Sequence, residues 1–254
     1  MDARGLRGGW ASFQRHSSVP PSPDLAPFVD HYWIARWDLR GQPPYRQLLP
    51  PTVGVHLSFV GEEAGEVRGP LRRFHHRTLA GEGRALGVAF RPGGFRPYLG
   101  GPVSAIADRS VPMDAVFDRA VVLPSALADE QLVDEVEQVL RADRPPVDPA
   151  GREASAAVDV IAADPALTRV DALASRLGVG VRSLQRLFAE YVGVGPKWCI
   201  RRYRLLEVTS RLADGAAVDW AALAAELGYA DQAHFSRDFT AILGEPPSRY
   251  ALRY

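Results

Sequence analysis

Apolar and polar residues alternate over short stretches in the first 141 residues of the chain. In residues 53–59 every second side chain is apolar, and residues 86–90 repeat the pattern before a breaker sequence at residues 91–94. A period of two is typical of a strand that buries one face. Residues 31–37, which are rich in aromatic side chains, and residues 77–80 are two further candidate strands. These patterns predict a mainly antiparallel β-sheet or a small barrel.

A helical period follows towards the end of this region. Residues 129–142 carry apolar side chains at helical spacing, which predicts an amphipathic helix. Residues 141–151 then contain three prolines and a glycine in a short polar stretch. Because prolines restrict the residues before them and end helices, we expect a domain boundary near residue 148. The predicted organisation is an N-terminal domain at 1–145, a linker at 146–151 and a C-terminal domain at 152–254.

The C-terminal domain shows closely spaced helical patterns and no strand pattern. Gly- and Pro-containing breaks separate these patterns, as expected where helices end. The expected helices are residues 153–163, 170–177, 181–191, 197–213, 220–227 and 232–242. The sequence therefore predicts an all-α domain of ordinary size.

This helical domain repeats itself. In the first copy a short helix centred on Leu173-Ala174 ends at Leu177-Gly178, and in the second a helix centred on Leu223-Ala224 ends at Leu227-Gly228. Glycine suits the left-handed conformation that ends a helix, and a second helix follows each tight turn. Two helices joined in this way are typical of a helix-turn-helix unit. The predicted fold class is therefore α+β, with an N-terminal antiparallel sheet or barrel-like domain and two helix-turn-helix units joined by the long helix at 197–213.

The second helix of each unit has one apolar face and one polar face. Leu184, Leu187 and Phe188 share a face in the first unit, as do Phe235, Phe239 and Ile242 in the second. These faces are expected to turn inward, so the opposite faces point outward. An outward arginine alone would be interpreted as a solvated charge, but two tandem copies favour contacts with base edges and phosphates of DNA. The candidate DNA-binding residues are Arg182, Ser183, Gln185 and Arg186 in the first unit, and Gln232, His234, Ser236 and Arg237 in the second.

Several short motifs in residues 152–254 carry a family resemblance. They are Leu173-Ala174 through Gly178, Ser183-Leu-Gln-Arg-Leu-Phe188, Gly193-Val-Gly-Pro196, Arg204-Leu205, the run from Leu227 to Phe239, and Gly244-Glu-Pro-Pro-Ser-Arg-Tyr250. At these positions the chain resembles the AraC/XylS family of transcription regulators. It departs from the family at Ala233, where a serine is common, and at Ala251, where an arginine often follows the tyrosine.

The resemblance implies a DNA-binding domain of about seven helices whose two recognition helices enter successive major-groove segments, about one turn or roughly 34 Å apart. It implies double-stranded DNA and RNA polymerase as partners. Carried over position by position, Arg182, Gln185 and Arg186 contact DNA from the first helix, and Gln232, His234 and Arg237 from the second. Residues 48–59 and 87–95 resemble a domain found ahead of some AraC-type modules. That resemblance implies effector sensing or homodimerisation by the N-terminal domain.

The composition adds few constraints. Lys plus Arg and Asp plus Glu both number 30, so any basic surface must be local. The single cysteine, Cys199, excludes an internal disulfide and a Cys-rich zinc module, and its apolar neighbours predict a buried small hydrophobe. No segment approaches about 18 consecutive apolar residues, so we expect a cytoplasmic protein that does not cross a membrane.

The N-terminal domain leaves two interpretations open. Trp33, Trp37, Phe59, Phe90 and Arg91 are candidate residues of an effector pocket, but the aromatic residues also suit the core of the sheet. An enzyme with its active site in this domain is the alternative function. We find no nucleophile or metal constellation for it: the adjacent His75 and His76 point to opposite faces of a strand. We therefore expect no catalytic residues, no metal and no cofactor.

Overall fold

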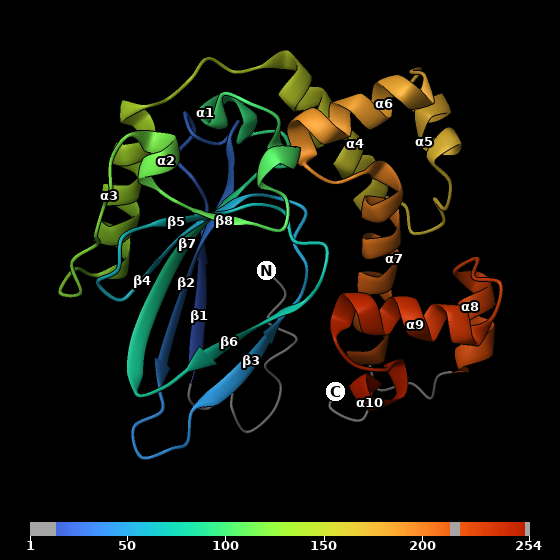
Figure 1. Cartoon of the computed structure of the whole chain (residues 1–254), viewed down its shortest axis with the longest axis horizontal. Helices are drawn as coiled ribbons and strands as arrows, with labels where there is room; N and C mark the ends of the chain where they lie inside the picture. Colours follow the sequence, from blue (N-terminus) through green and yellow to red (C-terminus); the bar gives the residue numbers. More distant parts are fainter. Residues whose placement is uncertain (1–13, 214–218, 252–254) are drawn as a thin grey trace.

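The computed structural model describes residues 14–213 and 219–251. Its N-terminal half is built around a six-stranded antiparallel sheet with the strand order β1-β2-β7-β4-β5-β8, and β3 and β6 form a separate two-stranded ribbon (Figure 1). The predicted antiparallel sheet is thus confirmed. The strands are β1 (Gln14–Val19), β2 (Val29–Asp38), β3 (Tyr45–Leu49), β4 (His56–Val60), β5 (Glu66–Arg68), β6 (His75–Leu79), β7 (Glu82–Phe90) and β8 (Ser110–Pro112).

One face of this sheet carries the hydrophobic core of the N-terminal domain. Alternate residues such as Tyr32, Leu57 and Val88 are fully buried there, and burying a side chain of this size contributes about 1.5–3 kcal/mol. The helix α3 (Asp129–Ala142) covers this face with Leu132 and Val136. Its bounds are those that the helical period predicts. Three short helices complete the layer: α1 (Arg96–Leu99), η3 (Val103–Ile106) and α2 (Asp114–Phe117).

The C-terminal half is all-helical, as predicted. Its helices are α4 (Pro149–Ala163), α5 (Val170–Arg176), α6 (Val181–Leu187), the π-helical segment η4 (Phe188–Val192), α7 (Pro196–Ala213), α8 (Trp220–Glu226), α9 (Gln232–Leu243) and α10 (Pro247–Ala251). Helix α4 begins inside the segment expected as a linker. Pro149 needs no hydrogen-bond acceptor at the first helical position, and the Asp148 side chain accepts from the Ala150 amide at 3.0 Å.

Helix α7 joins the two helix-turn-helix units. Cys199 and Ile200 near its start belong to the core of the first unit, whereas Leu205 and Val208 belong to the core of the second. Cys199 is fully buried, as expected, and burial raises the pKa of its thiol to about 12. No helix among the described residues is long and apolar enough to cross a membrane.

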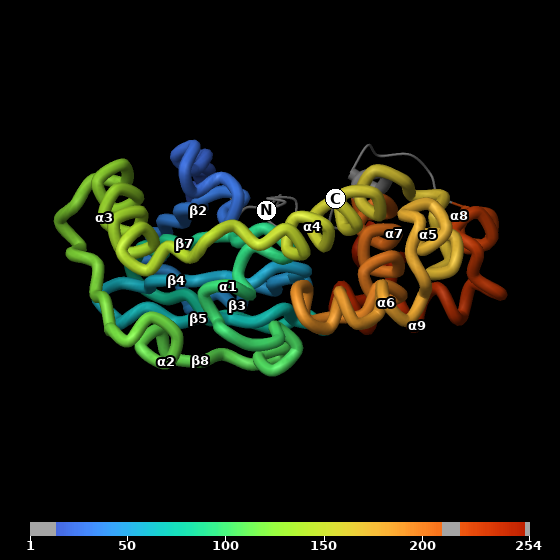
Figure 2. The backbone as a smooth tube through the Cα atoms, turned by 90° about the horizontal axis from the view of Figure 1, so that it is seen from above, coloured from blue at the N-terminus to red at the C-terminus, as the bar shows by residue number. Residues whose placement is uncertain are grey.

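The two domains lie side by side along the long axis of the molecule, with α4 between them (Figure 2). The loop after β7 and the start of α1 contact the helical domain. The Gly93 amide donates to the Tyr191 carbonyl at 3.1 Å, and Arg96 pairs with Glu190 at 2.9 Å. Val53 of the N-terminal domain is buried within the core of the first helix-turn-helix unit. The first unit therefore shares buried contacts with the sheet domain.

Candidate nucleic-acid interface

The first helix-turn-helix unit consists of α5 and α6. Leu173 and Ala174 of α5 are buried, so the second helix can cross closely. Gly178 then adopts φ +67°, and the Val179 amide donates to the Ala174 carbonyl at 3.0 Å. This left-handed glycine ends α5 and turns the chain into α6, as its place in the sequence predicts.

The second unit consists of α8 and α9 and repeats this geometry. Gly228 adopts φ +65°, and the Tyr229 amide donates to the Ala224 carbonyl at 2.9 Å. Aspartate side chains cap both helices: Asp219 accepts from the Ala221 amide at 2.9 Å, and Asp231 accepts from the His234 amide at 2.6 Å. The internal repeat in the sequence therefore corresponds to two hairpins of the same construction.

The polar faces of α6 and α9 point to solvent, because their apolar residues are buried on the opposite side. Phe188, Phe235 and Phe239 have no exposed surface. Seven of the eight sequence-predicted contact residues are exposed, and Ser236 is half-buried. Within the described residues no hydrogen bond or ion pair occupies the side chains of Arg182, Gln185, Arg186, Gln232 or Arg237. These side chains are therefore available to a ligand.

The acidic side chain of α9 is neutralised by a neighbouring arginine, which favours binding of an anion to the second unit. Asp238 is the acidic residue of α9, and Arg201 of α7 pairs with it at 3.0 Å. Arg204, which is buried, lies over the ring of Tyr229 at 5.5 Å and fastens α7 to the turn before α9. Sequence reasoning missed both contacts, because they join residues more than 20 positions apart.

Two exposed valines at the first unit were also missed. Val179 in the turn is 44% exposed, and Val181 at the start of α6 is 37% exposed. Apolar side chains at the start of a recognition helix can contact the methyl group of thymine. Because Val181 lies three residues before Leu184, the helical period alone would place it on the buried face, so the sequence carries no signal for its exposure.

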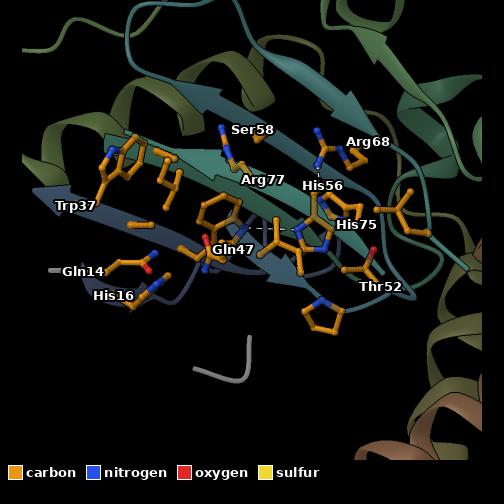
Figure 3. A pocket seen from close by; sticks show the side chains of 17 residues that line it. Gln14, His16, Trp37, Gln47, Thr52, His56, Ser58, Arg68, His75 and Arg77 are labelled. Atoms are coloured by element: carbon orange, nitrogen blue, oxygen red, sulfur yellow. Dashed lines mark hydrogen bonds between the residues drawn. The ribbon is translucent and has the colours of Figure 1, made fainter. Parts of the chain in front are cut away.

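The predicted effector residues do not all meet in the structure. Trp33 and Trp37 line a cavity of about 100 Å³ between the sheet and the β3–β6 ribbon (Figure 3). Phe59 and Phe90 lie in the hydrophobic core on the opposite face of the sheet. Arg91 donates from Nε to the Ala26 carbonyl at 2.8 Å and does not line the cavity.

Polar residues from other strands complete this cavity. His56 and Ser58 of β4, and His75 and Arg77 of β6, line it together with Arg68. The alternation in residues 53–59 contains part of this signal, since His56 and Ser58 occupy the face opposite the core. No group of three or more His, Cys, Asp or Glu among residues 14–213 and 219–251 is placed to hold a metal ion.

Two family models match separate parts of the chain. Residues 173–253 match a family model described as a helix-turn-helix domain. Residues 17–112 match a family model described as a domain of unknown function (DUF6597). No curated protein sequence matches the chain.

Solved structures that are similar to this chain include the following three. The C-terminal domain of AraT, a response regulator from Geobacillus stearothermophilus, is 20% identical over 43% of this chain and 88% of that chain, with a TM-score of 0.37. ToxT from Vibrio cholerae O395 is 13% identical over 94% of this chain and 96% of that chain, with a TM-score of 0.42. ToxT from Vibrio cholerae strain SCE256 with a bound unsaturated fatty acid is 11% identical over 95% of this chain and 93% of that chain, with a TM-score of 0.42.

The matched helix-turn-helix family and the two exposed polar helices define a DNA-binding transcription regulator. Its C-terminal domain carries the motifs that resemble the AraC type, and the domain of unknown function precedes it.

Proposed function

We propose that α6 and α9 are recognition helices that enter two successive segments of the DNA major groove. The observation that carries this proposal is the duplicated hairpin, which in each copy presents a donor-rich polar face whose arginine and glutamine side chains have no partner among the described residues. Arginine and amide side chains can recognise guanine and adenine edges in pairs of hydrogen bonds. The proposed contacts are Arg182, Ser183, Gln185 and Arg186 from α6, and Gln232, His234, Ser236 and Arg237 from α9.

The length of α7 supports a spacing near one turn of DNA. This helix has 18 residues, which corresponds to a length of about 27 Å. Figure 1 shows α7 running between the two hairpins, with α6 near one end and α9 near the other. A separation of this order suits two adjacent major-groove segments, which lie roughly 34 Å apart. One chain can then recognise both segments.

Binding to a selected duplex tests these contacts. Arg186→Ala and Arg237→Ala should each weaken binding by about 1–3 kcal/mol, which corresponds to roughly 5- to 150-fold in Kd. Binding should also weaken steeply with salt, because each phosphate contact releases counterions. Arg40→Ala, which removes an exposed arginine of the N-terminal domain, is the matched control and should leave Kd unchanged. Unchanged binding in both helix variants would contradict the proposal that α6 and α9 are recognition helices.

The N-terminal domain is proposed to sense a small-molecule effector, and its contacts with the DNA-binding domain support this role. Pro50 and Thr52 line the cavity, and between them the Pro51 carbonyl accepts from Arg202 Nε of α7 at 2.8 Å. At the end of α9, a Cβ on Gly244 would lie 2.5 Å from Leu48 and 3.0 Å from Phe74. A ligand that displaces this cavity wall would therefore act on α7 and α9.

Weakening that contact tests the regulatory role. Phe74→Ala removes a ring that packs at the end of α9, so it should change the DNA Kd of the ligand-free protein by about fivefold or more, the lower range of allosteric coupling. Arg73→Ala, an exposed neighbour, is the control. An unchanged Kd in Phe74→Ala would show that this contact does not couple the cavity to DNA binding.

The family resemblance extends the proposal to RNA polymerase as a partner, to homodimerisation through the N-terminal domain and to a cytoplasmic location. We propose no catalytic role for the chain, because no specific observation favours the enzyme alternative.

A further inference from the structure

The cavity between the sheet and the β3–β6 ribbon has distinct ends. Figure 3 shows Trp37 at one end, His56, His75 and Arg68 at the other, and Arg77 and Gln47 between them. The cavity volume is about 100 Å³. An apolar cavity of roughly 150 Å³ binds benzene, so this smaller space suits a body smaller than one ring, such as a short alkyl chain.

The apolar end is built by tryptophans that lie flat on β7. A Cβ on Gly87 would collide with the Trp33 indole, and a Cβ on Gly83 would collide with the Trp37 indole. Glycine at both positions leaves room for the rings against the sheet. Leu79 packs with Trp37 in the same small hydrophobic cluster. This end therefore offers an apolar surface to a ligand.

Two neutral histidines supply hydrogen-bond donors at the polar end. His56 Nδ1 accepts from Trp33 Nε1 at 3.4 Å, and burial lowers the pKa of His56 to about 3. Its Nε2 therefore carries the proton. His75 Nε2 lies 2.9 Å from Arg68 Nη1 and accepts from it, so the proton sits on His75 Nδ1. This Nδ1 is buried and has no partner within the described part of the chain.

The charges of the cavity are positive. Arg68 pairs with Glu66 at 2.8 Å. Arg77 forms no hydrogen bond or ion pair with any described residue, although Glu63 and Glu66 act on it electrostatically. Burial lowers the pKa of Arg77, but a guanidinium stays protonated. A partly buried cation without a counterion is costly, and a ligand acceptor would relieve that cost.

Among the described residues, the cavity lining contains no acidic side chain to match these donors. Its 17 side chains include two arginines and three histidines but no Asp or Glu. Gln14, Gln47, Thr52 and Ser58 can each donate as well as accept. The charged side chains of the lining are therefore cationic, which favours an anionic ligand over a cationic one.

The geometry points to a small organic monocarboxylate as the ligand of this cavity, with its carboxylate towards Arg77, His56 and His75 and its apolar body against Trp33 and Trp37. This inference names the ligand class of the effector site and rests on the proposed sensing role only for its biological meaning. Binding itself is independent of DNA. A neutral or cationic molecule of the same shape would leave Arg77 without a counterion.

Matched acids and amides test the charge requirement on the full chain. The probes are butyrate and isovalerate, each compared with its neutral amide, with binding measured by titration calorimetry and by tryptophan fluorescence. The acids should bind at least tenfold more tightly than the amides, because a hydrogen bond to a charged group is lost in the amides. Equal affinity of acids and amides, or no binding of either acid at millimolar concentration, would overturn the inference.

Substitution of Arg77 tests the position of the carboxylate. Arg77→Gln should weaken acid binding by about ten- to a hundredfold and leave amide binding unchanged, whereas Arg77→Lys, which keeps the charge, should recover part of the affinity. Arg46→Gln removes an exposed arginine from the same ribbon and is the matched control. Circular dichroism confirms that each variant is folded. Unchanged acid affinity in Arg77→Gln would show that the anion does not bind there.

The result is separable from the DNA-binding proposal. Acid binding that leaves the DNA Kd unchanged would keep the monocarboxylate site and remove its effector role. Loss of DNA binding in Arg186→Ala with normal acid binding would leave both proposals in place.

Discussion

The two helix-turn-helix units have the same construction but different attachments. The first unit contains Val53 of the sheet domain in its core, and its η4 segment bonds to the loop that holds Gly93 and Arg96. The second unit has a separate core, and the end of α9 at Gly244 meets the β3–β6 ribbon. The two hairpins therefore have the same internal structure, whereas their contacts with the N-terminal domain differ.

The largest expected effect on stability comes from substitutions in the hydrophobic cores of the two helix-turn-helix units. Phe188 of the first unit and Phe239 of the second are fully buried, and replacing either with Ala should cost about 3–5 kcal/mol of unfolding free energy. Native-state amide exchange should show lost protection in α8 and α9 for Phe239→Ala, with α4 to α6 close to wild type. Phe188→Ala should instead affect the first unit and the segment around Val53. Equal loss of protection throughout both variants would mean one cooperative unit.

Three Gly→Ala substitutions should lower the unfolding free energy by amounts that reflect how closely each glycine is packed. Gly93 has φ +90°, and a Cβ there would collide with the Gly151 carbonyl, so Gly93→Ala should cost about 3 kcal/mol or more. Gly244→Ala meets only side chains and should cost about 2 kcal/mol. Gly178→Ala, with open space around it, carries the left-handed penalty alone, about 1 kcal/mol. Urea unfolding measures all three, and a reversed order would contradict the closer packing of the first unit.

Acid should also distinguish the two units, by an amount that grows with each pH unit below 6.5. Burial lowers the pKa of His56 to about 3 and that of His75 to about 4, from the usual 6.5. The unfolded chain therefore binds more protons below pH 6.5, and the stability of the sheet domain falls as pH decreases from 6.5 towards 3. The slope is at most about 1.4 kcal/mol per pH unit for each histidine.

The attached first unit should lose amide protection together with the sheet domain as pH falls, and the second unit should follow less. His56→Asn should flatten the slope of stability against pH. A slope that is the same in this variant would exclude His56 as its source.

The smallest expected effect concerns the ion pair on α9. Asp238 is 14% exposed and pairs with Arg201, which is 36% exposed. Asp238→Asn should change stability by about 1 kcal/mol or less, as is usual near a surface. It should tighten DNA binding a few-fold at low salt, because the second unit becomes more positive. Weaker binding in this variant would mean that the carboxylate positions Arg201 on the DNA.

The helical domain was largely predictable because its signals are local. Leu173-Ala174 and Leu223-Ala224 mark both hairpins, and the helical period at residues 129–142 gives α3 its bounds. The cavity was only half predictable, because it depends on strand register. Trp33 pairs with Gly87 and Ser58 with the same glycine, so these residues share one face, whereas Phe59 pairs with Leu86 and lies on the other.

The β3–β6 ribbon left only a partial trace in the sequence, because the predicted strand at residues 77–80 overlaps β6 whereas β3 was not predicted. β3 reads Tyr-Arg-Gln-Leu-Leu and β6 reads His-His-Arg-Thr-Leu, and neither alternates strictly. Their pairing joins Tyr45 to Leu79, which are far apart in the chain. Tertiary context therefore decides these strands, as is common for short polar strands.

Selection of bound sequences from a random duplex library is the most direct test of two recognition helices in one chain. The wild type should select two short motifs whose centres lie about one helical turn apart. Arg186→Ala should lose preference in one motif only, and Arg237→Ala in the other only. Loss of preference at the same base pairs in both variants, or in neither, would contradict recognition by both α6 and α9.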